Sequence, residues 1–370
     1  MSPVGGKKKV VVAMSGGVDS SVTAALLLEQ GYEVIGVTMQ FRKPEAAPTE
    51  GGNGGCPDPN PVEDARRVAE QLGIPHYVLD FQDIFEEKVV NYFTSEYQGG
   101  RTPNPCIACN RHIKFGALLK KAFELGADYL ATGHYARVGF SDHFGRYTIR
   151  RPVDRKKDQT YVLYGLTQEQ IAHALMPLGE YTKEQVREMA AGFGLPVANK
   201  AESQDLCFIM QGSYQDYLRE KAINYKPGPF LNLQGEVIGT HKGIPFYTIG
   251  QRRGLNLAAG ERLYVVRIDA ENNTITLGPE KAIWGKCLRA ENANLILFEE
   301  LPGPIEVEAQ VRYNGRPAKA IVQAMDGNAL QVCFLTPQRS ITPGQSVVFY
   351  LGDYLGGGGI IEETIDNVEL

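Results

Sequence analysis

The sequence lacks most of the features that mark membrane, secreted or disulfide-stabilised proteins. None of its apolar runs approaches the roughly 18 residues that a membrane-spanning helix needs. Residues 1–9 are basic and lack the apolar core of a signal peptide. Six cysteines among 370 residues are too sparse for a disulfide scaffold. We therefore expect a cytoplasmic chain in a reducing compartment, where clustered cysteines usually serve catalysis or metal binding.

An excess of positive charge is also lacking, because the formal net charge is −5. This value argues only weakly against a nucleic-acid partner, since RNA responds to a local patch rather than to the total charge. Hydrophobic residues make up 43% of the chain and charged residues 22%, values typical of globular proteins. The length suits two or three domains.

Residues 1–210 predict an α/β domain, because strand-like and helix-like segments alternate there. The strand-like runs lie at 7–14, 33–40, 76–80 and 129–132, and the helical patterns at 20–30, 62–72, 84–97 and 113–125. Such alternation predicts a parallel sheet with helices on both faces. Residues 41–61 are rich in Pro, Gly and Asn and predict a long surface loop.

The pattern changes towards the C-terminus. Residues 211–285 predict a small central α+β module, with a helix at 213–222 followed by short strands between prolines and glycines. Residues 286–370 consist of strand-like runs separated by turn residues, which predicts an all-β barrel. We expect Gly356–Gly359 to form a tight turn.

A segment rich in glycine and serine, SGGVDSS at 15–21, joins the first predicted strand to the first predicted helix. Glycines let the backbone approach an anion, and the N-terminus of a helix offers N–H donors and a partial positive charge. The segment is not a Walker loop, because no lysine closes the turn. Asp19 fits an anion site only as a helix cap or facing a Mg²⁺ ion.

The SGGxDS pattern after a strand resembles the loop of the N-type ATP pyrophosphatases, which cut ATP between its α- and β-phosphates. The resemblance implies that Met39 contacts the adenine through its backbone and that Gly133 lies at a strand end beside the nucleotide. The implied ATP-binding residues are Ala13, Met14, Ser15, Gly16, Gly17, Val18, Asp19, Ser20, Met39 and Gly133.

Motifs along the whole chain are similar to those of the tRNA-specific 2-thiouridylase family of the MnmA type. These motifs are RTPNPxxxCNxxIKF, ATGHYAR, KDQTYVL and a C-terminal RY pair. The resemblance implies a sulfurtransferase that adenylates the 2-oxygen of the wobble uridine of tRNA. Sulfur then displaces AMP to give 2-thiouridine. A cysteine desulfurase or a sulfur-relay protein would supply the sulfur.

Three cysteines carry the sulfur chemistry that the resemblance implies, and two of them, Cys106 and Cys109, lie in a segment that we expect to be a loop (GGRTPNPCIACNRHIKFG, residues 99–116). Cys109 matches the family nucleophile, Cys207 matches the cysteine that receives the persulfide, and the two can form a transient disulfide. Cys106 stands where most members have an aspartate. Either Cys106 takes over proton handling, or the three cysteines ligate a [4Fe–4S] cluster whose open iron holds a labile sulfide.

The resemblance also implies contacts with the target base and the rest of the tRNA. The residues concerned are Asn104, Pro105, Cys106, His134, Lys157, Asp158, Gln159, Arg312, Tyr313 and Gln345. Lysine and arginine bind phosphates, whereas an aromatic ring can stack on an unpaired base. Residues 247–254 (YTIGQRRG) form either a further tRNA contact or an ordinary loop.

Two other functions remain open at this stage. One is another ligase or amidotransferase of the ATP pyrophosphatase class, which would need ammonia rather than a pair of thiolates. The other is an RNA-binding iron–sulfur module without catalysis, which the phosphate loop disfavours. We expect Cys287 and Cys333 to lie in the core and Cys56 to be an exposed bystander.

Overall fold

The computed structural model describes residues 7–42, 61–198, 200, 206–209, 213–221, 223, 225–257 and 262–365. The chain divides into two compact units. The first consists of Met1–Lys88 and Ala108–Gln204, and the second of Val89–Ile107 and Asp205–Leu370. The expected loop at 41–61, including Cys56, lies almost wholly outside the described residues. Among the helices that are described, none is long and apolar enough to cross a membrane.

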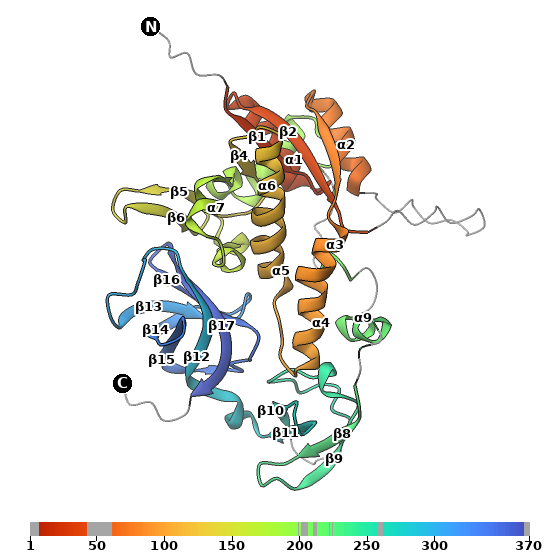
Figure 1. The fold of residues 1–370 in the computed structure, drawn as a ribbon, viewed down its shortest axis with the longest axis vertical. Coiled ribbons are helices and arrows are strands. Elements are labelled where there is room, and N and C mark those ends of the chain that lie inside the picture. The colour runs from red at the N-terminus through yellow and green to blue at the C-terminus, as the bar shows by residue number, and fades with distance from the viewer. Residues whose placement is uncertain are drawn as a thin grey trace, which may run out of the picture. The chain divides into compact units, whose positions relative to one another are not determined.

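The first unit contains a parallel sheet in the order β3-β2-β1-β4-β7, of which β1, β2 and β4 are labelled in Figure 1. Its strands are β1 (Lys9–Ala13), β2 (Glu33–Gln40), β3 (His76–Asp80), β4 (Tyr129–Ala131) and β7 (Ala174–Leu175). The three valines of β1 are fully buried. A continuous apolar strand is typical of a parallel sheet that is covered on both faces. The predicted α/β fold is therefore confirmed.

The order of these strands reverses at one place. The chain runs from β1 outwards through β2 and β3, and it then returns to place β4 on the other side of β1. In open parallel sheets, ligands bind at the carboxyl ends of the strands where the order reverses in this way. The segments that follow β1 and β4 are residues 14–17 and 132–134. Both contain predicted ATP-binding residues.

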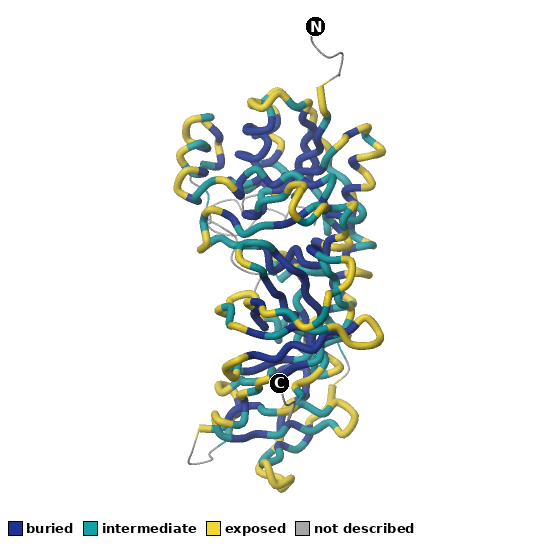
Figure 2. Tube along the Cα trace, turned by 90° about the vertical axis from the view of Figure 1, so that its left-hand side faces the viewer, coloured by how far each residue is buried: buried dark blue, intermediate teal, exposed yellow. Residues whose placement is uncertain are grey.

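Three helices share one apolar core with the sheet, namely α1 (Val18–Glu29), α2 (Pro61–Leu72) and α8 (Lys183–Gly192). Val22, Val68 and Val186 are fully buried in this core, one from each helix. Figure 2 shows buried stretches running through strands and helices, with exposed residues at the connections. The smaller elements of this unit are α3 (Gln82–Phe85), β5 (Arg137–Ser141), β6 (Arg146–Arg150), η3 (Arg155–Lys157), η4 (Thr160–Leu163), α7 (Gln168–Ala172) and η5 (Pro177–Glu180).

The segment around Cys106 and Cys109 is helical, whereas the sequence predicted a loop there. A continuous helix comprises α5 (Pro105–Ala108), the π-helix η2 (Cys109–Leu118) and α6 (Leu119–Glu124). Proline suits the first position of a helix, and the Asn104 side chain accepts a hydrogen bond from the Cys106 N–H at 3.1 Å. The helix therefore begins eight residues before the predicted start at 113. The division between the two units falls within it, after Ile107.

The second unit contains a small sheet and a closed barrel. The small sheet has the order β10-β11-β8-β9, and the barrel has the order β12-β15-β14-β13-β16-β17, with β17 pairing back onto β12. This closure confirms the predicted C-terminal barrel. The elements of this unit are α4 (Asn91–Gln98), α9 (Tyr214–Glu220), β8 (Gly228–Leu231), β9 (Val237–His241), η6 (Ile244–Phe246), β10 (Tyr264–Asp269), β11 (Thr274–Gly278), η7 (Glu280–Ile283), β12 (Trp284–Leu295), β13 (Ile305–Gln310), β14 (Ala318–Met325), β15 (Ala329–Arg339), β16 (Ser346–Leu351) and β17 (Tyr354–Ile365); η1 (Glu86–Val90) spans the division.

The glycine run Gly356–Gly359 is part of a strand, so the expected tight turn is wrong. All four glycines belong to β17, which pairs with both β16 and β12. A Cβ at Gly356 would collide with the buried ring of Phe349 on β16. The run is glycine-rich because side chains and backbone from neighbouring strands approach it closely, and not because the chain reverses there.

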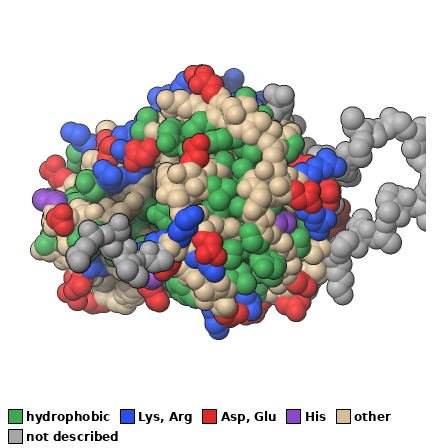
Figure 3. All heavy atoms as spheres, turned by 90° about the horizontal axis from the view of Figure 1, so that it is seen from above, with side chains coloured by type: hydrophobic (Ala, Val, Ile, Leu, Met, Phe, Trp, Pro, Cys, Tyr) green, Lys and Arg blue, Asp and Glu red, His purple; other side chains and the backbone are tan. Residues whose placement is uncertain are grey.

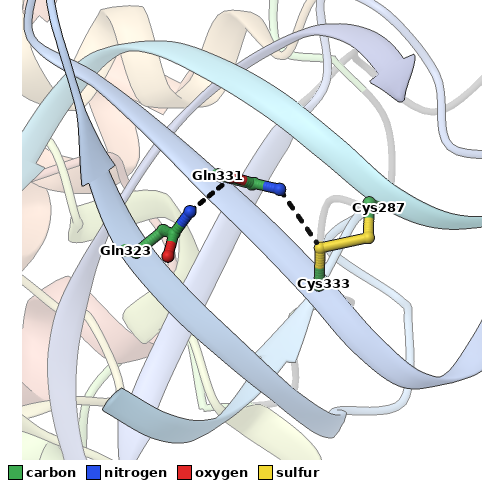
Figure 4. Close-up of a disulfide and its surroundings, with 4 residues drawn as sticks. All are labelled: Cys287, Gln323, Gln331 and Cys333. Carbon is green, nitrogen blue, oxygen red and sulfur yellow. Dashed lines mark hydrogen bonds between the residues drawn. A yellow bond between two sulfur atoms is a disulfide. The ribbon is translucent and has the colours of Figure 1, made fainter. Parts of the chain in front are cut away.

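Cys287 and Cys333 lie in the core as expected, but they also form a disulfide that the sequence did not predict (Figure 4). The two residues face each other directly across the antiparallel pair β12–β15, with Cα atoms 4.1 Å apart. Each is only 2% exposed, and the Gln331 side chain donates to Cys333 Sγ at 3.6 Å. Forty-six residues separate the two cysteines in the sequence, so only the strand register brings them together.

Candidate functional site

The loop between β1 and α1 is held by hydrogen bonds among its own residues. Ser20 Oγ accepts from the Ser15 N–H at 3.1 Å and donates to the Gly17 carbonyl at 3.2 Å. Gly16 has φ +68°, and a Cβ there would collide with the Pro61 carbonyl. Gly17, the N-cap residue of α1, has no side chain that could cap the helix. The first-turn N–H groups and the helix dipole therefore favour an anion at this point.

Asp19 is neither a helix cap nor an isolated carboxylate. Its Oδ1 accepts a hydrogen bond from Lys183 Nζ at 2.7 Å and another from the Tyr135 hydroxyl at 2.9 Å. Lys183 is the first residue of α8 and is 9% exposed, and Tyr135 is 2% exposed. The ammonium of Lys183 thus compensates the negative charge that made Asp19 puzzling in an anion site.

A second lysine holds the other side of the loop. Lys200 Nζ donates to the Gly16 carbonyl at 2.9 Å and to Asp64 Oδ2 at 2.6 Å. A charge-assisted contact to a main-chain carbonyl fixes the loop backbone more firmly than a neutral one does. The two lysines supply the cations that the loop sequence itself lacks.

The segment after β4 packs against the start of α1. A Cβ at Gly133 would lie 2.9 Å from the Ser20 N and 3.0 Å from the Asp19 carbonyl carbon. Only a residue without a side chain permits this approach. Gly133 thus lies beside the phosphate loop, and Met39 lies near the end of β2, next to β1 in the sheet.

His134 is buried in a polar chain next to this glycine. Lys114 Nζ donates to His134 Nε2 at 3.4 Å, so Nδ1 carries the hydrogen and donates to Thr132 Oγ1 at 2.7 Å. Burial lowers the pKa of His134 well below its ordinary value, and the nearby charge of Lys114 lowers the pKa further. The imidazole is therefore neutral at physiological pH, and the predicted tRNA contact would have to be made by an uncharged ring.

The three predicted catalytic cysteines differ in exposure and in the unit to which they belong. Cys109 is a buried thiol at the start of η2 in the first unit, whereas Cys106 and Cys207 are exposed thiols in the second. Asn110, which is 2% exposed, donates to the Val162 carbonyl at 3.0 Å and thereby anchors the helix beside Cys109. Among the described residues, no group of three or more Cys, His, Asp or Glu side chains is arranged to hold a metal ion.

The residues before Cys106 are held by the barrel of the same unit. The Gln345 side chain donates to the Thr102 carbonyl at 2.9 Å, and the Thr102 N–H donates to the Pro343 carbonyl at 2.9 Å. Arg101 forms ion pairs with Glu96 and Glu362, each at 2.8 Å. Gln345, predicted as a tRNA contact, therefore has a structural contact in this arrangement.

The remaining predicted RNA-binding residues fall into two groups. Asp158 Oδ1 accepts from the Thr160 N–H and hydroxyl, and Gln159 Oε1 accepts from the Tyr135 N–H at 2.9 Å. Lys157 precedes them at the end of η3. Arg312 and Tyr313 follow β13 on the barrel and are exposed, with Tyr313 38% exposed.

Sequence reasoning missed Tyr135, Lys183 and Lys200. Lysines in or near amphipathic helices are common, and no spacing relates Lys183 to Asp19, which lies 164 positions earlier. Tyr135 lies inside the ATGHYAR motif, which is the one signal in the sequence that could have found it.

On the face shown in Figure 3, basic and acidic side chains are interspersed and do not gather into one basic area.

The fold and the site define a protein with an α/β domain of the kind that binds nucleotides, followed by a small sheet and a β-barrel. Comparisons with known proteins match the same three parts of the chain. Family models match residues 8–211 (tRNA methyl transferase HUP domain), 215–279 (tRNA methyl transferase PRC-barrel domain) and 285–361 (aminomethyltransferase beta-barrel domain). A protein of Pelotomaculum thermopropionicum named tRNA-specific 2-thiouridylase MnmA is 67% identical over 97% of this chain and 99% of its own length. Its namesake from Desulforamulus reducens is 59% identical over 97% and 98%. The chain belongs to the tRNA-specific 2-thiouridylase MnmA family.

Similarity to solved structures is much lower. A 4-thiouridine synthetase–RNA complex with bound ATP has 17% sequence identity and a TM-score of 0.32, covering 59% of this chain and 51% of that chain. At this level of similarity, the solved structure gives no information about the site of this protein.

Proposed function

We propose that the protein is an ATP-dependent sulfurtransferase that converts the wobble uridine of tRNA to 2-thiouridine. The observation that carries the proposal is the phosphate loop at the strand-order reversal, where Lys183 neutralises Asp19 beside an uncapped helix N-terminus. Full-length relatedness to the thiouridylases named above supports tRNA as the acceptor. Family membership therefore supports tRNA as the substrate, and the phosphate loop supports ATP as the activating reagent.

The first step activates a carbonyl oxygen that is a poor leaving group. The 2-oxygen of uracil attacks the α-phosphorus of ATP, the bond to the β-phosphate oxygen breaks, and pyrophosphate leaves. The first-turn N–H groups of α1 would bind the phosphates, and electrostatic stabilisation of this kind is usually a large part of catalysis. In this proposal, loop atoms between Ala13 and Ser20 would surround the phosphates, Gly133 would lie beside them and Met39 would face the adenine.

The second step transfers sulfur from a cysteine. A persulfide on Cys207 attacks C2 of the adenylated base with its terminal sulfur, and AMP leaves with the former 2-oxygen. The Cys109 thiolate then attacks the Cys207 sulfur, which leaves 2-thiouridine and a Cys109–Cys207 disulfide. An external thiol reductant resets the two thiols. Exposure of Cys207 suits a residue that receives sulfur from a cysteine desulfurase or relay protein.

The three thiols that could ligate a [4Fe–4S] cluster are divided between the two units, Cys109 in the first and Cys106 and Cys207 in the second, and among the described residues no group of three such side chains is arranged to hold a metal ion. We therefore derive no step through a cluster. A Mg²⁺ ion bound with ATP does fit, because Asp19 places a carboxylate beside the phosphate loop. Such an ion usually combines one or two carboxylates with phosphate oxygens, and when bound it would offset phosphate charge.

Two of the proposed tRNA contacts on the barrel are exposed. Arg312 and Tyr313 offer a cation and a stacking ring, and Lys157 follows two exposed cations on η3. Asn104, Pro105 and Cys106 form the start of the helix that contains Cys109, where the target base would lie. Cys106 is the proposed proton-handling group in the place of the family aspartate.

The central test measures pyrophosphate and nucleoside products together. Purified protein with ATP, unmodified tRNA and a persulfide donor should release pyrophosphate and yield 2-thiouridine by mass spectrometry, but release little pyrophosphate without tRNA. Asp19→Ala should abolish both products. Pyrophosphate release that is indifferent to tRNA, or to this substitution, would exclude the proposed acceptor or the proposed loop.

The sulfur route has its own test. Cys207→Ser should still release pyrophosphate with tRNA but form no 2-thiouridine, because activation precedes sulfur transfer. Iron and sulfide analysis of anaerobically purified protein should find neither in stoichiometric amount. Stoichiometric iron that is lost on Cys106→Asp would replace the persulfide route with a cluster.

A further inference from the structure

The loop of this protein has to bind a triphosphate without a cation of its own. The residues from Met14 to Ser21 include no lysine or arginine, and Asp19 adds a negative charge. In P-loop enzymes, the lysine at the end of the loop reaches the β- and γ-phosphates. The same electrostatic need exists here, and it must be met from elsewhere in the fold.

Lys183 and Lys200 both reach the loop, but their surroundings differ. Lys200 bridges Gly16 O and Asp64 Oδ2, so it ties main chain to α2. Lys183 contacts Asp19 Oδ1 at the first turn of α1, where an anion is favoured. An ammonium group has three donors, so Lys183 can keep Asp19 and still donate to a phosphate oxygen.

The position of Lys183 is set firmly by its own helix. Thr182 caps α8 in a capping box with Gln185, and the Lys183 N–H donates to Asp154 Oδ2 at 3.0 Å. The ammonium also lies 5.8 Å from the centre of the Tyr135 ring. A buried cation that is fixed in this way loses little further side-chain entropy when an anion arrives.

We propose that Lys183 is a ligand of the β- and γ-phosphates of ATP and of the pyrophosphate that leaves. Asp19 holds the ammonium in place, and when a phosphate binds, the ammonium donates to a phosphate oxygen as well. The proposal deepens the proposed function and rests on its ATP site. Lys200 has the different role of fixing the loop backbone.

The test is calorimetric binding of pyrophosphate in EDTA, so that no metal ion contributes, together with binding of ATP. Lys183→Gln should weaken pyrophosphate binding by about 10- to 100-fold, the usual worth of a charge-assisted hydrogen bond. Lys183→Arg should retain part of the affinity. Lys121→Gln is the matched control, since Lys121 is exposed on α6 and pairs with Glu124. Affinity for tRNA should be unchanged in all three variants.

A double variant distinguishes two roles of Lys183, namely binding the phosphates directly and merely neutralising the charge of Asp19. If Lys183 acts only by neutralising Asp19, then Asp19→Asn combined with Lys183→Gln should restore pyrophosphate binding. If Lys183 binds the phosphates, the double variant stays weak while its unfolding midpoint returns towards that of the wild type. Wild-type affinity in Lys183→Gln, or recovery of binding in the double variant, overturns this inference alone. A wild-type protein that binds neither ATP nor pyrophosphate overturns the proposed ATP site as well.

Discussion

At the scale of single residues, the buried His134 makes the stability of the fold depend on pH. Its ring is neutral because burial and the Lys114 charge both disfavour the protonated form, and its two nitrogens are committed to Lys114 and Thr132. Burial also lowers the pKa values of His76, His112 and His241. All four shifts have the same consequence for the pH dependence of folding.

We predict that the free energy of unfolding falls as the pH drops below about 6.5, the ordinary pKa of histidine. Above that value both folded and unfolded states hold a neutral ring. Below it the unfolded chain binds a proton that the folded chain refuses, so stability is lost as the pH falls towards the lowered folded-state pKa. Urea unfolding at pH 7.5, 6.5 and 5.5 measures the slope. His134→Gln should flatten it, and an unchanged slope in this variant would show that His134 does not contribute.

At the same scale, Cys106 is the residue proposed to handle protons in place of the aspartate that most family members have. Cys106 is the second residue of α5, and its N–H donates to Asn104 Oδ1 at 3.1 Å. The Cys106 thiol is exposed, which suits the proton-handling role proposed for it.

At the scale of elements, the barrel is fastened by the Cys287–Cys333 disulfide across β12 and β15. We predict that reducing this bond lowers the free energy of unfolding by about 2–4 kcal/mol, since it closes a loop of 46 residues in the unfolded chain. Urea unfolding with and without a phosphine reductant measures the difference. The variant Cys287→Ala/Cys333→Ala should be insensitive to the reductant. Peptide mapping that finds both cysteines alkylated in unreduced, denatured protein would show that the bond does not form.

A second connection between elements holds the segment before Cys106 on the barrel. Gly344 has φ +88°, and a Cβ there would lie 2.8 Å from the Thr102 N. The adjacent Gln345 donates to the Thr102 carbonyl. The turn before β16 thereby sets the path of residues 101–103, which lead into α5.

We predict that Gly344→Ala lowers the rate of thiolation at saturating ATP and tRNA by about tenfold or more, because a displacement of about 1 Å in a positioning segment can cost that much. Gly352→Ala is the matched control. It has a similar strained backbone at φ +57° but nothing within 4 Å of the new Cβ. Both variants should lose about 1 kcal/mol of stability from the left-handed backbone. Equal rates in the two variants would exclude a positioning role for the turn.

At the scale of the whole molecule, the chain forms two compact units whose division runs through the helix that contains Cys106 and Cys109. Cys109 belongs to the unit with the phosphate loop, whereas Cys106 and Cys207 belong to the unit with the barrel. The net charge of −5 makes local cations more important for tRNA binding than the total charge.

We predict that tRNA affinity falls steeply with salt despite the negative net charge, since phosphate contacts release counterions. Arg312→Gln should reduce the slope of log K against log salt by about 0.7–0.9, the amount expected for one lost phosphate contact. Lys121→Gln, which removes an exposed charge on α6, should leave the slope unchanged. Filter binding at several salt concentrations provides the measurement, and equal slopes in the two variants would remove Arg312 from the tRNA surface.

The sequence alone predicted the α/β domain, the C-terminal barrel and the phosphate loop, because each depends on local patterns. The buried run of β1, the helix that follows SGG and the exact span of β2 are set by side-chain periodicity over a few residues. The sequence-based prediction is wrong where local patterns are ambiguous. Proline is compatible with either a loop or the start of a helix, as at Cys106–Cys109. Glycine is compatible with either a turn or a closely packed strand, as at Gly356–Gly359, so packing determines which one forms.

Only the tertiary structure decided which distant residues complete the site. Lys183 reaches Asp19 across 164 positions and Lys200 reaches Gly16 across 184, and Cys333 meets Cys287 through strand register. Sequence patterns describe what neighbours along a chain can do, whereas ion pairs and disulfides depend on which elements pack together. The packing of α8 beside α1 in one core is what gives the loop its missing cation.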